Sequence, residues 1–154
     1  MNPVEYETVQ IEKTKKGCPL CEDYAKGQAS KPVVVMSCEG GCLRGEVARR
    51  AANVLCFELA PEKTARLCLG GAFTKDTGQR ALARNAKRIV AIEGCFIECA
   101  TWMMKGVAPE LKAEVVIADS LYDFDRNLFG INEMSNSELN AHSRGVATAV
   151  AARL

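Results

Sequence analysis

The sequence predicts an α/β domain built on a Rossmann-like open, mostly parallel sheet of four or five strands, with helices on both faces. Two observations lead to this prediction. Short apolar, β-branched runs recur along the chain, as they do in buried parallel strands. Each run is followed by a segment whose apolar residues recur at helical spacing. Strands that alternate with helices imply right-handed crossovers and therefore a parallel sheet.

Four runs are expected to form the strands, at residues 33–36, 65–69, 88–92 and 114–118. Residues 4–11 have weaker strand character. Four helices are expected at residues 43–55, 76–86, 96–107 and 135–154. Asp76, with Gln79 three residues later, makes an N-cap for the second helix, and Ser135 with Glu138 makes a capping box for the last.

The chain is expected to divide into an N-terminal extension, residues 1–31, and an α/β domain, residues 32–154. Within the extension, residues 17–31 hold a Cys-x-x-Cys element followed by polar and small residues, which predicts a loop or short appendage. Hydrophobic residues make up 48% of the 154-residue chain and charged residues 25%, the balance of a globular protein. Such a chain can bury a core without metal or disulfides.

Charge and hydropathy argue against two classes of partner. The formal net charge is +1, from 20 basic and 19 acidic residues, so no basic footprint for nucleic acid or an anionic membrane is expected. The N-terminus does not read as a signal peptide, and no segment approaches the roughly 20 apolar residues of a spanning helix. A cytoplasmic location follows as the default. The sequence names no protein partner, and a homodimer stays open.

The chain has eight cysteines. Cytoplasmic thiols are kept reduced, so metal binding or thiol chemistry is favoured over a disulfide framework. Five of the eight fall where the predicted strands end. Cys38 follows the first strand, Cys68 ends the second and Cys95 follows the third, while Cys42 and Cys99 each lie four residues further on. On the first turn of a helix that spacing puts both sulfurs on one face.

The carboxyl ends of parallel strands meet at one edge of the sheet, where such folds bind their ligands. Helix N-termini there supply free N–H groups and a partial positive charge, which favour the thiolate. Several thiolates within reach repel one another, and Zn²⁺ with tetrahedral sulfur ligands at about 2.3 Å overcomes that repulsion. The sequence therefore predicts a zinc site at this edge. Cys56, inside a helical pattern, is expected to be a small core residue.

Three stretches carry a resemblance to a known family: residues 37–42 (SCEGGC), 67–71 (LCLGG) and 92–100 (IEGCFIECA). They resemble the DGC-domain family, whose members are described as zinc-binding proteins. The resemblance covers roughly residues 32–125. It implies that the family's four characteristic cysteines are Cys38, Cys68, Cys95 and Cys99, and that Cys42 is a further one found in some members. The Asp of the family motif is Glu93 here, and the first motif has an extra residue between its cysteines.

The remaining cysteine pair, Cys18 and Cys21, lies outside this resemblance. The local string GCPLC looks like a glutaredoxin active site, although the expected order of strands and helices does not follow it. It is equally compatible with half of a metal knuckle. A metal-capable or redox-active element and a plain loop both stay open.

Other polar residues near the expected edge are weaker candidates. Glu93 is placed to orient a ligand or move a proton, whereas solvated surface positions are expected for Glu39 and Glu98. Three acids follow the fourth strand: Asp119, Asp123 and Asp125.

The only histidine, His142, is expected to be partly buried on the last helix. Core positions are expected for Trp102, Met103 and Met104.

Three functions remain open. The first is metal binding, with zinc held by Cys38, Cys68, Cys95 and Cys99 and also Cys42. The second is a thiol-redox or sulfur-transfer enzyme, in which Cys95 or Cys38 is the nucleophile and Cys99 or Cys42 resolves it. The third is an iron–sulfur site on the same cysteines. No phosphate-binding motif is present, and no catalytic class is supported.

Overall fold

The computed structural model describes residues 1–12, 16–74 and 76–154. Within them the strands form one four-stranded, all-parallel sheet in the order β2-β1-β3-β4. The strands are β1 (Val33–Ser37), β2 (Thr64–Arg66), β3 (Arg88–Glu93) and β4 (Glu114–Ile117). The helices are α1 (Pro19–Gln28), α2 (Leu43–Val54), α3 (Leu69–Phe73), α4 (Gly78–Asn85), α5 (Cys99–Val107) and α6 (Asn136–Ala151). The α/β class and the parallel sheet predicted from the sequence are confirmed.

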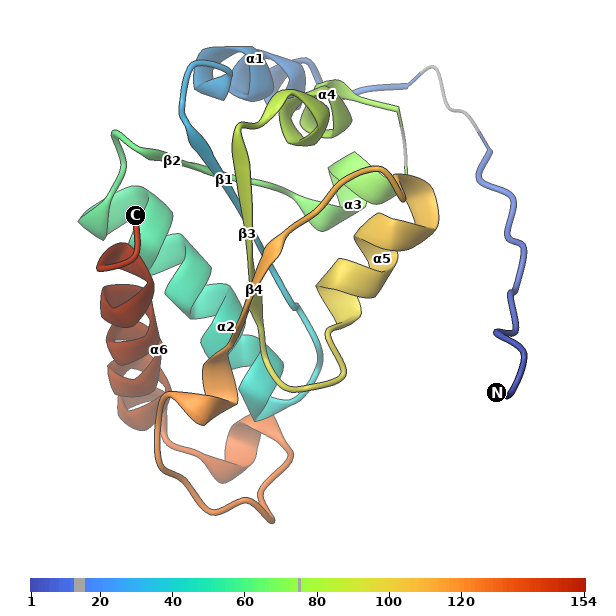
Figure 1. Cartoon of the computed structure of the whole chain (residues 1–154). Coiled ribbons are helices and arrows are strands. Elements are labelled where there is room, and N and C mark those ends of the chain that lie inside the picture. The colour runs from blue at the N-terminus through green and yellow to red at the C-terminus, as the bar shows by residue number, and fades with distance from the viewer. Residues whose placement is uncertain (13–15, 75) are drawn as a thin grey trace.

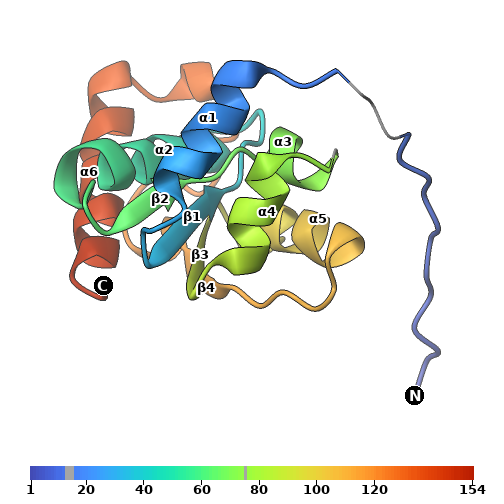
Figure 2. The ribbon, with the colours of Figure 1, turned by 90° about the horizontal axis from the view of Figure 1, so that it is seen from above.

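Helices cover both faces of the sheet (Figures 1 and 2). Side chains alternate along β1, so that Val33 and Val35 enter the core beneath α2 and α6. Val34 and Met36 enter the opposite core, beneath α3, α4 and α5. All five residues of β1 are buried, as expected for the strand that lies between two neighbours.

The strand order creates a switch point between β1 and β3. The helix that follows β1, α2, packs on one face of the sheet, and the helix that follows β3, α5, packs on the other. The two loops therefore leave adjacent strands in opposite directions. In open α/β sheets, ligands bind in the crevice that such diverging loops leave at the carboxyl edge.

The N-terminal part of the chain differs from its prediction. Residues 4–11 form no strand, and residues 13–15 of the expected extension lie outside the described residues. Residues 17–31 were expected to form a loop or short appendage. The loop is wrong, because residues 19–28 form the helix α1, which packs on α4. Pro19 occupies the first helical position, where its fixed φ suits a helix start. Ala25 of α1 is buried, and the Tyr24 hydroxyl donates to the Arg66 carbonyl at 3.0 Å.

Three other element boundaries differ from those expected. The strand expected at 65–69 ends at Arg66, and Cys68 becomes the N-cap of the short helix α3. The helix expected from Asp76 begins after Thr77, whose side chain accepts from the Gln79 N–H. The helix expected from residue 96 begins only at Cys99. As a result, neither cysteine pair with four-residue spacing lies within one helical turn.

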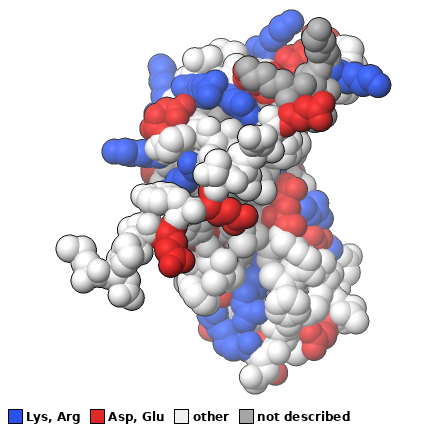
Figure 3. All heavy atoms as spheres, turned by 90° about the vertical axis from the view of Figure 1, so that its right-hand side faces the viewer, with Lys and Arg blue, Asp and Glu red and all other residues white. Residues whose placement is uncertain are grey.

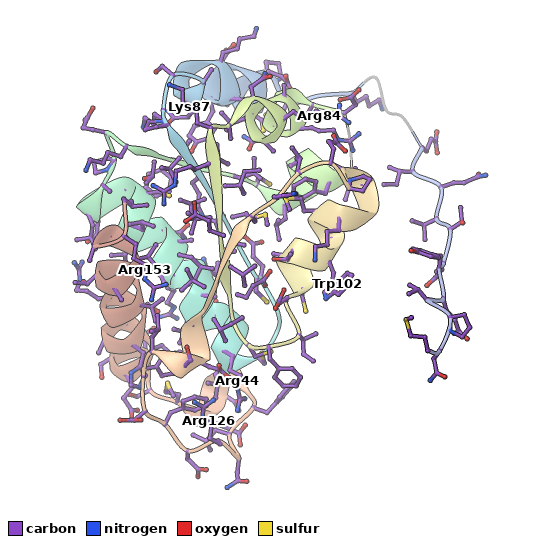
Figure 4. The ribbon with its side chains drawn as sticks, in the orientation of Figure 1. Arg44, Arg84, Lys87, Trp102, Arg126 and Arg153 are labelled. Atoms are coloured by element: carbon purple, nitrogen blue, oxygen red, sulfur yellow. The ribbon has the colours of Figure 1, made fainter. Side chains whose placement is uncertain are left out.

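The outer side of α5 is also more apolar than expected. Met104 is in the core, but Trp102 is 63% exposed and Met103 43%, so their core positions were wrong. Phe96 and Ile97, in the preceding loop, are exposed as well. Trp102 points away from the body in Figure 4, and Figure 3 shows broad areas without charged side chains on this side.

Other predictions hold closely. The strands at 33–36, 88–92 and 114–118 are found within one residue of their expected ends. The capping box of Ser135 and Glu138 starts α6, and Cys56 is a buried core residue. Among the described residues, none of the helices has the length and apolar character needed to cross a membrane.

Gly40, Gly45 and Gly94 lie where the loops after β1 and β3 contact the start of α2. A Cβ on Gly45 would lie 2.7 Å from the Gly40 nitrogen, and one on Gly94 would lie 2.7 Å from the Gly45 nitrogen. Real Cβ atoms do not approach backbone so closely, so only glycine permits this packing. The backbones of both loops therefore rest directly on the first turn of α2.

Replacing Gly45 by alanine should destabilise the fold even though alanine is the better helix former. We expect Gly45→Ala to lower the free energy of unfolding by about 1–3 kcal/mol, because backbone must move to admit the methyl group. The matched control is Gly145→Ala in α6, where the new methyl meets open space. That change should instead raise stability by about 0.5–1 kcal/mol. Urea unfolding measures both, and equal effects would contradict the packing argument.

Candidate functional site: a cysteine-rich sheet edge

The loops after β1 and β3 lie side by side at the carboxyl edge of the sheet, the lower edge in Figure 1. The Cys38 N–H donates to the Ile92 carbonyl at 3.0 Å, which extends the strand pairing into the loop. Cys38 is 6% exposed, and its sulfur is approached by the backbone N–H groups of Gly40 and Gly94. One cysteine thus receives donors from both loops.

Cys42 lies next to Cys38 in space. A methyl group placed on Gly40 would be 3.6 Å from the Cys38 Sγ and 3.8 Å from the Cys42 Sγ, so the two sulfurs flank the same glycine. Cys42 is half-buried, forms the N-cap of α2 and makes an isolated antiparallel bridge with Gly130. Its position is therefore fixed by the helix on one side and by the loop before α6 on the other.

The electrostatics of Cys38 link it to the second loop. Burial raises the pKa of the Cys38 thiol, and the N–H groups of Gly40 and Gly94 oppose that shift. The neighbouring Cys99 thiol and the Glu93 carboxylate raise the pKa further. Cys99, exposed at the first position of α5, is therefore near enough to Cys38 for its charge to be felt across the two loops.

Glu93 sets the path of the loop that carries Cys95 and Cys99. Its side chain, fully buried at the end of β3, accepts three hydrogen bonds from α5. The donors are the N–H of Ala100 at 3.3 Å and, both at 2.7 Å, the N–H and the hydroxyl of Thr101. These N–H groups belong to the first turn of α5 and would otherwise lack partners. Glu93 therefore acts as a remote cap of α5 and is not open to a ligand.

The loop between Glu93 and α5 is tightly wound. Cys95 is half-buried, and its carbonyl accepts from the Glu98 N–H at 3.2 Å. Glu98 has φ 55° and ψ 45°, a left-handed conformation that few non-glycine residues adopt. This turn and the remote cap together explain why α5 begins at Cys99 rather than at residue 96.

Cys68 is held differently. It is exposed at the N-cap of α3, where the Gly71 N–H approaches its sulfur at 3.5 Å. Its own N–H donates to the Gln79 Oε1 at 3.1 Å, and the Gln79 Nε2 donates to the Cys21 Sγ at 3.5 Å. The Gln79 side chain thus links Cys68 to Cys21 of α1, a connection that was not predicted from the sequence.

Arg66 links the ends of β1 and β2 behind these cysteines. Its guanidinium donates to the Ser37 hydroxyl at 2.8 Å and to the Glu39 carboxylate at 3.0 Å. Further bonds reach the Leu67 carbonyl and the Asn53 side chain. Glu39 is exposed as expected, but it is paired rather than only solvated.

The acids after β4 serve the loop rather than the cysteines. Asp119 is buried and accepts from Arg44 at 3.2 Å and from Arg126 at 3.0 Å. The two guanidinium groups stack on the ring of Phe124, and they lie close together in Figure 4. Two other candidates, Asp123 and Asp125, are exposed. These contacts pin the loop against the start of α2, beside Cys42.

His142 stacks on Tyr122 with ring centroids 4.6 Å apart and is half-buried on α6, as expected. The Tyr122 hydroxyl is buried and has no hydrogen-bond partner in the described part of the chain. Burial raises the pKa of Tyr122, and the charges of Asp119 and Cys42 add to that shift. Tyr122 therefore packs between Phe124 of the loop and His142 of α6.

The five predicted site cysteines all lie at the carboxyl edge, but not as one group. Contacts or electrostatics join Cys38 to Cys42 and to Cys99, and Cys95 lies on the same loop as Cys99. Cys68 is connected with Cys21 instead. Among the described residues, no three His, Cys, Asp or Glu side chains stand in an arrangement that could hold a metal ion.

Removing the remote cap should weaken the fold. We expect Glu93→Ala to lower the free energy of unfolding by about 3 kcal/mol, because it leaves buried donors of α5 without an acceptor. The control is Glu39→Ala, which removes an exposed carboxylate at the same edge and should cost less than about 1 kcal/mol. Denaturant unfolding of both variants measures the difference. Similar losses would mean that Glu93 is not a cap of α5.

Thiol alkylation should separate the cysteines by exposure. In reduced, metal-free protein we expect iodoacetamide to modify Cys18, Cys68 and Cys99 first, and Cys38 and Cys56 last. Burial hinders access to the last two and raises their pKa, and the thiolate is the reactive form. Peptide mapping by mass spectrometry over time gives the order. Modification of Cys38 as fast as Cys99 would contradict the packing of the β1 loop.

Among comparisons with known proteins, one gives a match, to a protein family. No curated protein and no solved structure matches the chain. The model of one family, described as the DGC domain, matches residues 34–143. The matched region runs from β1 into α6 and includes the five cysteines of the edge, but not Cys18 or Cys21. The chain belongs to the DGC-domain family.

Proposed function

We propose that this protein binds a metal ion, Zn²⁺ in the first place, through thiolates at the carboxyl edge of the sheet. The ligands would be Cys38, Cys42, Cys95 and Cys99, with Cys68 as the further candidate. The observation that carries the proposal is the meeting of the β1 and β3 loops at the switch point. There, Cys38 lies against Cys42 on its own loop and interacts with Cys99 of the other loop.

The donor chemistry supports this proposal. Zinc prefers thiolate and imidazole ligands, and the single histidine of the chain stacks on Tyr122 on the side of α6. Two of the carboxylates near the edge are committed elsewhere, Glu93 to α5 and Glu39 to Arg66, and a third, Glu98, is half-buried between Cys95 and Cys99. Sulfur is therefore the most abundant donor at the edge, which favours Zn²⁺ over oxygen-preferring cations such as Mg²⁺ and Ca²⁺.

The site combines one fixed ligand with adaptable ones. Cys38 is buried and receives two backbone N–H groups, whereas Cys42 and Cys95 are half-buried and Cys99 is exposed. Cysteine has one side-chain torsion, so these outer sulfurs can turn toward a cation near Cys38 without refolding the loops. Closely packed loops with outer thiols that can change rotamer would suit a protein that holds zinc and also releases it.

A site with four thiolates has no open position for water, so hydrolysis is not part of the proposal. Holding, sensing or delivering zinc is the class of function that it supports. Each thiol must lose its proton to bind the metal, so zinc binding should release protons. The affinity for zinc should therefore increase with pH.

Metal analysis of protein purified under anaerobic conditions tests the proposal. We expect close to one zinc per chain, with about four thiols protected from reagent until a chelator is added. Replacing Cys38, Cys95 or Cys99 singly by serine should weaken zinc binding by at least about 100-fold in a chelator competition, as loss of a ligand exceeds loss of a supporting residue. Cys56→Ala, which changes a buried cysteine away from the edge, should bind zinc as the parent does.

Three outcomes would overturn the zinc proposal. A brown protein that contains iron and sulfide would make the edge an iron–sulfur site. A metal-free protein in which two of these cysteines react rapidly would make it a thiol-redox or sulfur-transfer site. Equal zinc loss in the serine variants and in Cys56→Ala would place the metal elsewhere.

A further inference from the structure

Cys18 and Cys21 lie in the first turn of a helix that is firmly docked. Cys18 is the N-cap of α1, and its carbonyl accepts from the Cys21 N–H at 3.0 Å. Residues three apart in a helical turn are neighbours, within the range of Cα separations that a disulfide requires. The backbone of this turn therefore allows the two sulfurs to bond without moving the helix.

The docking of α1 rests on contacts that are independent of the cysteines. The Glu22 carboxylate accepts from the Gly78 N–H at 2.9 and 3.1 Å, which places it at the N-terminus of α4. Ala25 is buried, and Tyr24 is bonded to Arg66 of β2. The cysteine pair is thus carried on a rigid support beside the sheet, as Figure 2 shows for α1 and α4.

The two cysteines differ in exposure and in partners. Cys18 is exposed, and Cys21 is half-buried with its sulfur against the Gln79 amide. Gln79 is only 2% exposed. Its Oε1 accepts from the Cys68 N–H, which can only donate, so the Nε2 group must be the one that faces the Cys21 sulfur. This contact holds the Cys21 sulfur at a defined place against α4, whereas the Cys18 side chain is exposed.

We propose that Cys18 and Cys21 form a second functional site, a dithiol that exchanges with disulfides independently of the metal-binding edge. An exposed first thiol and a fixed, less accessible second thiol are the two parts that such exchange requires. The substrate class is a small-molecule or protein disulfide that can approach α1 from solvent.

The chemistry balances as follows. The Cys18 thiolate attacks one sulfur of the incoming disulfide, and the first thiolate leaves and takes up a proton. The Cys21 thiolate then attacks the Cys18 sulfur of the mixed disulfide, and the second thiolate leaves with the other proton. The dithiol loses two electrons and two protons, and the incoming disulfide is reduced to two thiols.

Oxidised glutathione, added to the full chain with and without bound zinc, tests this inference. We expect the parent protein to form the Cys18–Cys21 disulfide, identified by mapping peptides without reduction. Cys21→Ser should accumulate the glutathione adduct on Cys18, because the resolving thiol is gone. Cys18→Ser should acquire an adduct on Cys21 at least about tenfold more slowly, because that sulfur is half-buried.

Two results would overturn the inference. The first is a stable glutathione adduct on Cys18 of the parent protein without the internal disulfide. The second is a disulfide between Cys21 and Cys68, which would make Cys18 a bystander. Far-UV circular dichroism of each serine variant checks that the helical content of the protein is unchanged. Because the readout is a peptide mass rather than metal content, a failed zinc experiment and a failed exchange experiment are distinguishable.

Discussion

The carboxylate of Glu93 is the contact on which the cysteine edge depends. It ends the central strand β3 inside the core, and its bonds to Ala100 and Thr101 start α5 at a defined residue. Few backbone conformations can connect Glu93 to the start of α5 at Cys99, and the loop adopts one with a left-handed turn at Glu98. The glycine packing of Gly40, Gly45 and Gly94 then brings this loop onto the β1 loop. Internal hydrogen bonding and backbone contact, rather than the cysteines themselves, bring the thiols together.

The regular parts of the fold follow from patterns that act locally. The apolar runs of β1 and β3 and the capping box of α6 each specify their element with residues adjacent in sequence, so their boundaries could be predicted. Two of the misplaced boundaries are set by distant partners: β2 ends where the Cys68 N–H donates to Gln79, eleven residues later, and α5 starts where Glu93 caps it. Two helices had an unused local signal. For α1 it is Pro19 at the first position with Glu22 in the first turn, and for α4 it is Thr77, whose side chain accepts from the Gln79 N–H.

The candidate site was predictable to the same degree. That cysteines at the ends of parallel strands reach one edge follows from topology alone, and the order β2-β1-β3-β4 agrees with it. Which cysteines are neighbours within the edge depends on loop paths. Cys38 lies beside Cys42 and feels the charge of Cys99 because two loops share the start of α2, whereas Cys68 is linked through Gln79 to Cys21 of α1. The role of Glu93 was missed because a buried strand carboxylate and a ligand-orienting one look alike in sequence.

The two outer strands of the sheet are short: β2 has three residues and β4 has four. At the β4 edge, Glu114 is exposed and forms an ion pair with Arg88 of β3. Short and charged edges offer little unpaired backbone to another chain, and this is how proteins with open sheets avoid pairing edge to edge. Helices and loops, rather than the rims of the sheet, are therefore the surfaces through which another chain would meet this one.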